Sequence, residues 1–230
     1  MVKKAKTKPK TESPQDELYK EVRGYKVKIK KSQIEKRLTN EEERTLIDSI
    51  VYDTHKNMWE RNRAIIVFLL NTGLRVSEFQ QLVVSDVMAM NGKPKSMLDV
   101  RPSTAKRKKP RHVPLNNLAK ESIVALLKGR EELSFNDPLT TKDGINGLSR
   151  RAIQEVVHTA SLKAGINRQI FPHTLRHTFL SKIYSKTGNL KITQTLAGHS
   201  NSKLTMDLYV HTTVEEMEDA VSLIVDDKEV

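Results

Sequence analysis

The chain has 230 residues, no cysteine and a formal net charge of +12. The absence of cysteine excludes disulfides, thiolate metal sites and cysteine nucleophiles. No segment approaches the roughly 18 apolar residues of a membrane-spanning helix, and no apolar secretory signal follows the basic N-terminus, so we expect a cytoplasmic protein without membrane contact. The excess of 40 Lys and Arg over 28 Asp and Glu favours a nucleic acid as partner, because neutralised phosphates release counterions. Charge alone also fits a merely soluble basic protein or an RNA binder of the ribosomal type.

The charge is concentrated at the N-terminus. Residues 1–37 hold 13 Lys or Arg against five Asp or Glu, a net charge of +8 that leaves +4 for the remainder. The opening lysines are interrupted by Pro9 and have almost no apolar neighbours, a composition typical of disorder. A short helix within Gln15–Val22 and a weak strand over Tyr25–Ile29 are expected here. We therefore predict a basic, partly disordered arm over 1–37 and one folded domain over 38–230.

Capping residues and apolar periodicity predict a mainly helical domain. Thr39 and Glu42 form a capping box that begins a helix running through Ile50. Further helices are predicted at about 62–71, 76–83, 118–129, 149–164, 173–186, 190–196 and 214–225. Between them, the turn Asn91-Gly92 and two short runs predict strands Met97–Arg101 and Arg111–Leu115, joined by a basic loop. The expected fold class is α+β, with a small antiparallel sheet.

Four short segments carry residue types that act on phosphates. They are 72–78 (TGLRVSE), with Arg75 at a helix start, 106–111 (KRKKPR), 173–178 (HTLRHT), and 196–200 (LAGHS), which Tyr209 follows ten residues after His199. Taken alone, each has a simpler interpretation. Arg75 fits a surface arginine, the basic loop a solvated hairpin tip, and Tyr209 a half-buried packing residue.

His173 and His177 are spaced i and i+4, as in some metal sites. No acidic residue lies between them in the zinc-protease arrangement, and Arg176 shares their helix face. We therefore expect no bound metal.

Taken together, the four segments suit phosphoryl transfer without a metal. A phosphodiester gains negative charge on its non-bridging oxygens as it becomes five-coordinate, and guanidinium groups bind two oxygens in a fixed geometry while staying charged. His173 and Arg176 lie three residues apart on a helix and face the same way, so both could meet one phosphate. The helix N-terminus adds its own attraction for anions.

This ordered set resembles the tyrosine recombinases, the integrase superfamily of phages and conjugative transposons. The resemblance spans roughly residues 38–225 and keeps the family's order of arginine, hairpin lysine, His-x-x-Arg, Gly-His and tyrosine. It implies that Tyr209 is the nucleophile, forming a 3′-phosphotyrosyl link and freeing a 5′-hydroxyl. It also implies that Arg75, Arg176 and His199 cradle the scissile phosphate.

The remaining roles follow from the same resemblance. His173 would accept the tyrosine proton, and Lys106 would protonate the leaving oxygen. Lys106 is preferred over Lys108 and Lys109 because it lies seven residues before Val113 in the family's hairpin pattern. Glu78 matches a supporting position behind the first arginine. The remaining basic residues of the hairpin are expected to contact DNA: Arg107, Lys108, Lys109 and Arg111.

The resemblance implies a site-specific DNA recombinase that integrates, excises or inverts DNA without metal or nucleotide cofactor, because the covalent ester conserves the bond energy. The expected partners are double-stranded DNA, three further copies in a homotetramer on paired sites, and accessory DNA-bending or directionality proteins, in the cytoplasm and nucleoid-associated. Two alternatives stay open, a DNA-relaxing topoisomerase of the same superfamily and a non-catalytic DNA-binding regulator. The arm stands where the family normally carries a helical core-binding domain. Either this is a short member, like the small fimbrial invertases, or a partner supplies that clamp.

Overall fold

The structure is a computed structural model that describes residues 17–22, 25–30, 37–50, 58–101, 111–130 and 132–198. The chain divides into two compact units, Met1–Lys36 and Arg37–Val230. None of the helices in the described segments is long and apolar enough to cross a membrane. The helix predicted at 214–225 lies outside the described residues.

The first unit contains an antiparallel pair of strands, β1 (Glu17–Val22) and β2 (Tyr25–Lys30). The predicted strand is confirmed, but the helix predicted within Gln15–Val22 is wrong. An isolated helix of about eight residues is marginal in water, because its nucleation cost is spread over few hydrogen bonds. Pairing Leu18 with Ile29 and Val22 with Tyr25 in the β-register gives the same backbone groups partners on a neighbouring strand.

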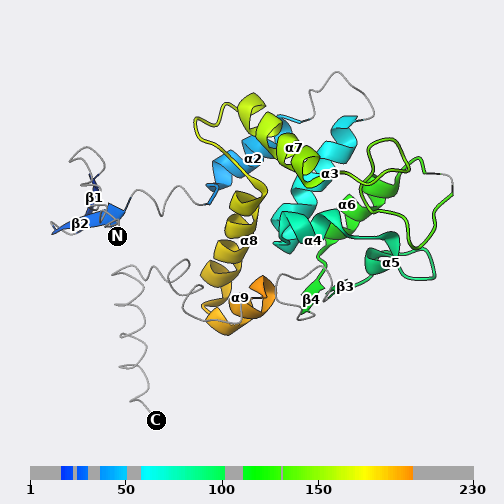
Figure 1. Cartoon of the computed structure of the whole chain (residues 1–230). Helices are drawn as coiled ribbons and strands as arrows, with labels where there is room; N and C mark the ends of the chain where they lie inside the picture. The colour runs from blue at the N-terminus through cyan, green and yellow to red at the C-terminus, as the bar shows by residue number, and fades with distance from the viewer. Residues whose placement is uncertain are drawn as a thin grey trace, which may run out of the picture. The chain divides into compact units, whose positions relative to one another are not determined.

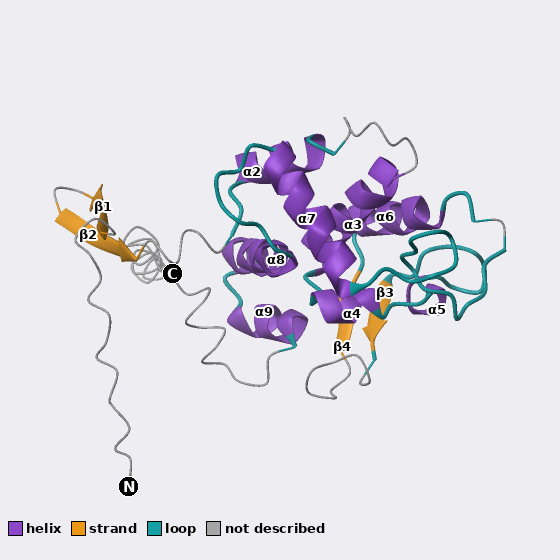
Figure 2. Cartoon of the chain, turned by 45° about the horizontal axis from the view of Figure 1, so that its top comes forward, coloured by secondary structure: helices purple, strands orange, loops and turns teal. Residues whose placement is uncertain are grey.

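In its described residues the second unit is mainly helical, with one two-stranded antiparallel sheet, as the sequence predicted (Figures 1 and 2). Its helices are α2 (Asn40–Asp48), α3 (Met58–Thr72), α4 (Val76–Gln80), α5 (Val84–Val87), α6 (Asn117–Leu127), α7 (Arg150–Lys163), α8 (Pro172–Thr187) and α9 (Leu190–Ala197). Its sheet pairs β3 (Met97–Val100) with β4 (Arg111–Pro114). In both views α8 and α9 lie side by side.

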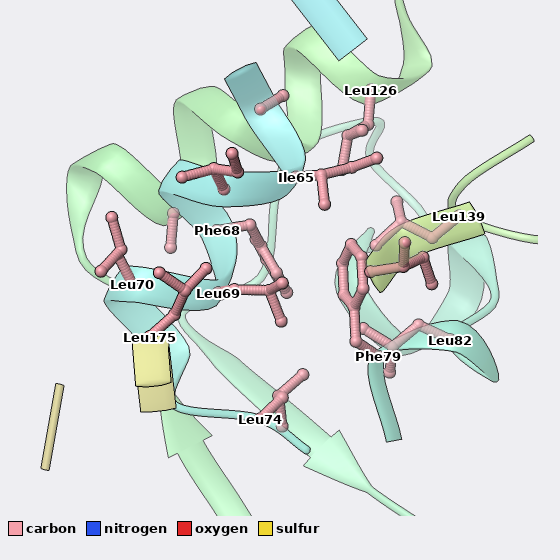
Figure 3. Packing of buried hydrophobic residues seen from close by; sticks show 14 of the residues in the cluster. Ile65, Phe68, Leu69, Leu70, Leu74, Phe79, Leu82, Leu126, Leu139 and Leu175 are labelled. Atoms are coloured by element: carbon pink, nitrogen blue, oxygen red, sulfur yellow. The ribbon is translucent and has the colours of Figure 1, made fainter. Parts of the chain in front are cut away.

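Helix α3 is the centre of the hydrophobic core. Every residue from Ala64 to Leu70 is buried, as expected for a helix that neighbours cover on all sides. Around it, Figure 3 shows Leu175 of α8, Leu126 of α6 and side chains from the α4 region. The rings of Phe68 and Phe79 lie with centroids 5.4 Å apart, which ties α4 directly to α3.

Local sequence signals set most helix ends within about three residues. The capping box of α2 is present, with Thr39 and Glu42 each accepting a hydrogen bond from the other's backbone N–H group. The helix predicted over 76–83 is instead interrupted. It stops at Gln80, and Val83 forms a bridge to Pro138 before α5 begins. Leu82, next to this bridge, is buried like the apolar face of a helix, so the apolar spacing predicted one helix across the interruption.

Gly73 ends α3 in a left-handed conformation, with φ of +59°. Its N–H group donates to the Leu69 carbonyl at 3.1 Å, which closes the last turn of the helix. A Cβ atom at this position would lie inside van der Waals distance of the Phe179 ring on α8. Glycine therefore serves both the backbone turn and the close approach of α3 and α8, and this turn leads directly to Arg75.

We predict that Gly73→Ala destabilises the fold more than Gly129→Ala. Both positions have positive φ, so each alanine costs about 1–2 kcal/mol of backbone strain. Only at Gly73 does the new methyl group overpack a ring, which adds about 1–3 kcal/mol, whereas nothing lies within 4 Å of the corresponding atom at Gly129. Urea unfolding of both variants measures the difference. Equal losses would show that Phe179 moves aside freely.

Candidate active site

Arg176 lies in the first turns of α8 and points into the protein. Its side chain is only 2% exposed. Nη1 donates to the Gly73 carbonyl at 2.6 Å, and Nη2 donates to the Ala197 carbonyl at 2.5 Å. One guanidinium thus connects the turn after α3 with the end of α9, two segments more than a hundred residues apart.

Arg75 directly precedes α4 and is held by Glu78, whose side chain is fully buried. The Arg75 backbone N–H donates to Glu78 Oε2 at 2.8 Å, and its Nη1 donates to Oε1 at 2.8 Å. The Arg75 side chain stays 23% exposed, so it can still meet a ligand at the surface. This geometry fits the supporting position expected for Glu78, and its role remains a prediction.

The two arginines converge on one backbone carbonyl. Arg75 Nη2 donates to the Ala197 oxygen at 3.4 Å, and Arg176 Nη2 donates to the same atom. Ala197 closes α9, and Gly198 follows it in a left-handed conformation with φ of +60°. Three of the four segments singled out from the sequence therefore meet at this carbonyl.

His173 lies one turn before Arg176 on α8 and is exposed to solvent. Partial burial lowers the pKa of His173 below its ordinary value of 6.5, and the charges of Arg176 and Arg75 lower it further. His177 packs edge-on against this ring, with centroids 4.3 Å apart. The arrangement keeps His173 neutral near pH 7 and therefore able to accept a proton.

The structure gives Arg111 a position different from the expected DNA contact. Its side chain is 7% exposed, and its Nη1 and Nη2 donate to Glu78 Oε1 and Oε2, each at 2.7 Å. The signal was present in the sequence, because strand alternation puts Arg111 on the same face as the buried Val113. A second feature that the sequence did not indicate is the Ala197 carbonyl, since main-chain atoms leave no trace in residue types.

Glu78 thus accepts four hydrogen bonds, two from each arginine. Burial raises the pKa of this carboxyl, but hydrogen bonds and charge from Arg111, with those of Arg75, outweigh burial and lower the pKa to about 2. Glu78 therefore stays ionised at every pH at which the protein would work. The group of two guanidiniums and one carboxylate keeps a net charge of +1.

The other predicted site residues lie outside the described residues, namely Lys106, Arg107, Lys108, Lys109, His199 and Tyr209. Within the described part, no three His, Asp or Glu side chains are grouped as a metal would require. The independence from metal and nucleotide remains a prediction.

The described part of the site is suited to an anion with several oxygens. Two guanidiniums and the start of a 16-residue helix meet a neutral imidazole at one place. The two guanidiniums and the N-terminus of the helix all attract negative charge, and none of them has to lose a proton to bind an anion.

The chain is similar in sequence to a known family and to named members of it. The sequence profile of the phage integrase family matches residues 36–216. The tyrosine recombinase XerC of Listeria innocua is 30% identical over 181 residues, which cover 76% of this chain and 58% of that protein. The tyrosine recombinase XerD of Corynebacterium glutamicum is 32% identical over 181 residues, covering 75% and 55%.

A solved structure shares the fold. The XerH site-specific recombinase bound to its difH substrate superposes with a TM-score of 0.67 and 27% identity, over 81% of this chain and 54% of that one. The chain thus spans somewhat more than half the length of these relatives. With the family profile covering most of its residues, the chain belongs to the phage integrase family.

Proposed function

We propose that the protein is a site-specific DNA recombinase that cleaves and rejoins DNA strands through Tyr209. The observation that carries this proposal is the convergence of Arg75 and Arg176 on the Ala197 carbonyl, with His173 one turn away. A purely DNA-binding regulator has no need for two half-buried or buried guanidiniums at one point. Membership of the phage integrase family and the names of the relatives give independent support.

In the proposed reaction the Tyr209 oxygen attacks the scissile phosphorus. The bond from phosphorus to the 5′-oxygen breaks, and a 3′-phosphotyrosyl ester and a free 5′-hydroxyl form. His173 accepts the phenolic proton, and Lys106 delivers a proton to the leaving 5′-oxygen. Arg75, Arg176 and His199 stabilise charge on the non-bridging oxygens, where donors contribute more than in water. Attack by a 5′-hydroxyl from another strand reverses these steps and completes the exchange.

The finer features of the function belong to the same proposal. Exchange between two duplexes needs two cleaved sites, each cut on both strands, so we propose a homotetramer on paired DNA sites with accessory DNA-bending or directionality proteins. The protein would act on the nucleoid in the cytoplasm. Arg107, Lys108 and Lys109 would contact the DNA backbone beside the cleaved bond.

The first test of the function is a covalent trap. In a nicked substrate, cleavage releases a short fragment that carries the 5′-hydroxyl, and this fragment diffuses away. Religation is then blocked, so a protein–DNA complex stable to SDS should accumulate. Tyr209→Phe should abolish this complex and leave DNA binding unchanged, because only the attacking oxygen is removed. Trapping that persists in Tyr209→Phe contradicts the assignment. Recombinant product, as opposed to a relaxed circle, separates a recombinase from a topoisomerase.

The role of His173 predicts a titration below the ordinary value. Because burial and two arginines lower the pKa, the neutral form should persist as the pH falls through 6.5, and cleavage should persist with it. NMR titration of the free protein, assigned with His173→Gln, measures this directly. In Arg75→Gln the midpoint should rise, since one cause of the shift is removed. A wild-type midpoint at or above 6.5 contradicts the proposed electrostatics.

The role of Lys106 predicts rescue by a better leaving group. Proton delivery by a general acid contributes about 10²–10⁴ in rate. Lys106→Ala should therefore cleave ordinary DNA slowly but DNA with sulfur at the bridging 5′ position almost normally. Arg176→Ala should stay slow on both substrates, because it serves the non-bridging oxygens.

The neighbouring lysines are matched controls for this assignment. Lys108→Ala and Lys109→Ala should weaken binding without any rescue by sulfur. Rescue at either one, and none at Lys106, moves the acid to that residue. Rescue at none of the three places the general acid elsewhere.

A further inference from the structure

Arg111 directs its guanidinium away from solvent. It begins β4, directly after the basic loop, and donates through Nη1 and Nη2 to the two oxygens of the fully buried Glu78. This is the bidentate geometry that carboxylates and phosphates both favour, and here the carboxylate occupies it. A DNA phosphate outside the protein would have to displace Glu78 to reach the same face of Arg111.

The charge balance shows what Arg111 does for Arg75. Glu78 accepts hydrogen bonds from the backbone and side chain of Arg75 as well as from Arg111. Without Arg111, one buried carboxylate would face one guanidinium, and the pair would be neutral. Glu78 would then attract Arg75 alone. The negative charge of Glu78 would offset the attraction of Arg75 for a ligand, and the Arg75 side chain would be drawn inward.

Arg111 also contacts the segment that precedes His199. A Cβ atom on Gly198 would lie 3.0 Å from both Cδ and Nη1 of Arg111, closer than ordinary packing allows. Helix α9 and strand β4 are accordingly neighbours. The same side chain thus supports the backbone next to the Ala197 carbonyl that both Arg75 and Arg176 use.

We propose that Arg111 is a positioning residue that neutralises Glu78, so that the charge of Arg75 remains available to the scissile phosphate. The proposal rests on the function proposed above. It makes Arg111 the structural link between the basic hairpin and the site, because β4 carries this residue at the point where the loop ends. Arg111 acts through Glu78 and does not touch DNA.

The decisive test is a charge-suppression experiment. Arg111→Met should slow formation of the covalent Tyr209 complex, on the order of 10- to 100-fold, which is less than the loss of a whole transition-state donor. Adding Glu78→Gln to Arg111→Met should raise the rate again, because the unbalanced carboxylate is gone and Arg75 is released. Loss of packing alone predicts a double variant as slow as the single variant or slower.

Binding measurements separate the two roles that an arginine could have. Affinity falls as salt rises, and removing one phosphate contact makes the slope of log affinity against log salt shallower by about 0.9. Arg107→Met should show this change whatever residue stands at position 78. Arg111→Met should show it only through Glu78, so adding Glu78→Gln to Arg111→Met should restore the wild-type slope. Arg130→Met is the control for losing a buried arginine, since Arg130 is 9% exposed and bonds to Pro138 and Asp137 away from the site. It should leave both the slope and the cleavage rate unchanged.

Thermal unfolding without DNA keeps the outcomes distinct. Arg111→Met and Glu78→Gln should be coupled, with the double variant more stable than the two losses added together. Where Arg111→Met melts below the assay temperature, Arg111→Lys replaces it and should be slowed less. A salt slope that stays reduced in the double variant, or no rate recovery there, overturns the role of Arg111 while wild-type trapping persists. Absence of trapping in the wild type overturns the proposed function instead, and the stability coupling still tests the ion pair.

Discussion

The site depends on holding like charges together at one place. Two guanidiniums that lie close together repel each other, and burial makes that repulsion stronger. The protein meets this constraint with acceptors that have fixed positions. Glu78 supplies a full negative charge, and the carbonyls of Gly73 and Ala197 supply dipoles. Each arginine is therefore oriented before a ligand binds.

The core explains why these acceptors lie where they do. Helix α3 is buried from Ala64 to Leu70, and it ends at Gly73 because only glycine fits both the left-handed turn and the Phe179 ring. Helix α8 packs along α3 and brings Arg176 to the Gly73 carbonyl. The apolar packing of α3 against α8 thus sets the distance between their backbones. The polar contacts then select the orientations of the arginine side chains.

The sequence predicted the fold class and most helices, because capping residues and apolar periodicity are local signals. Among the site residues that it predicted, Arg75, His173 and Arg176 are brought together by the structure through helices α4 and α8. It failed where pairing decides the outcome. Strand β1 competes with a helix of equal local plausibility, and Arg111, which is predicted to contact DNA, has its partner Glu78 33 residues earlier in the chain. Neither partner is visible in a local window.

The shared Ala197 carbonyl has a consequence for how such proteins vary. One oxygen accepts hydrogen bonds from two arginines, one on α8 and one in the turn before α4. The orientation of each arginine therefore depends on the position of the end of α9. A chimera that takes its C-terminal segment from a relative would join foreign α9 geometry to resident arginines. Successful exchanges between family members should therefore have crossover points before Gly73 or after Gly198, so that all three partners stay in one block.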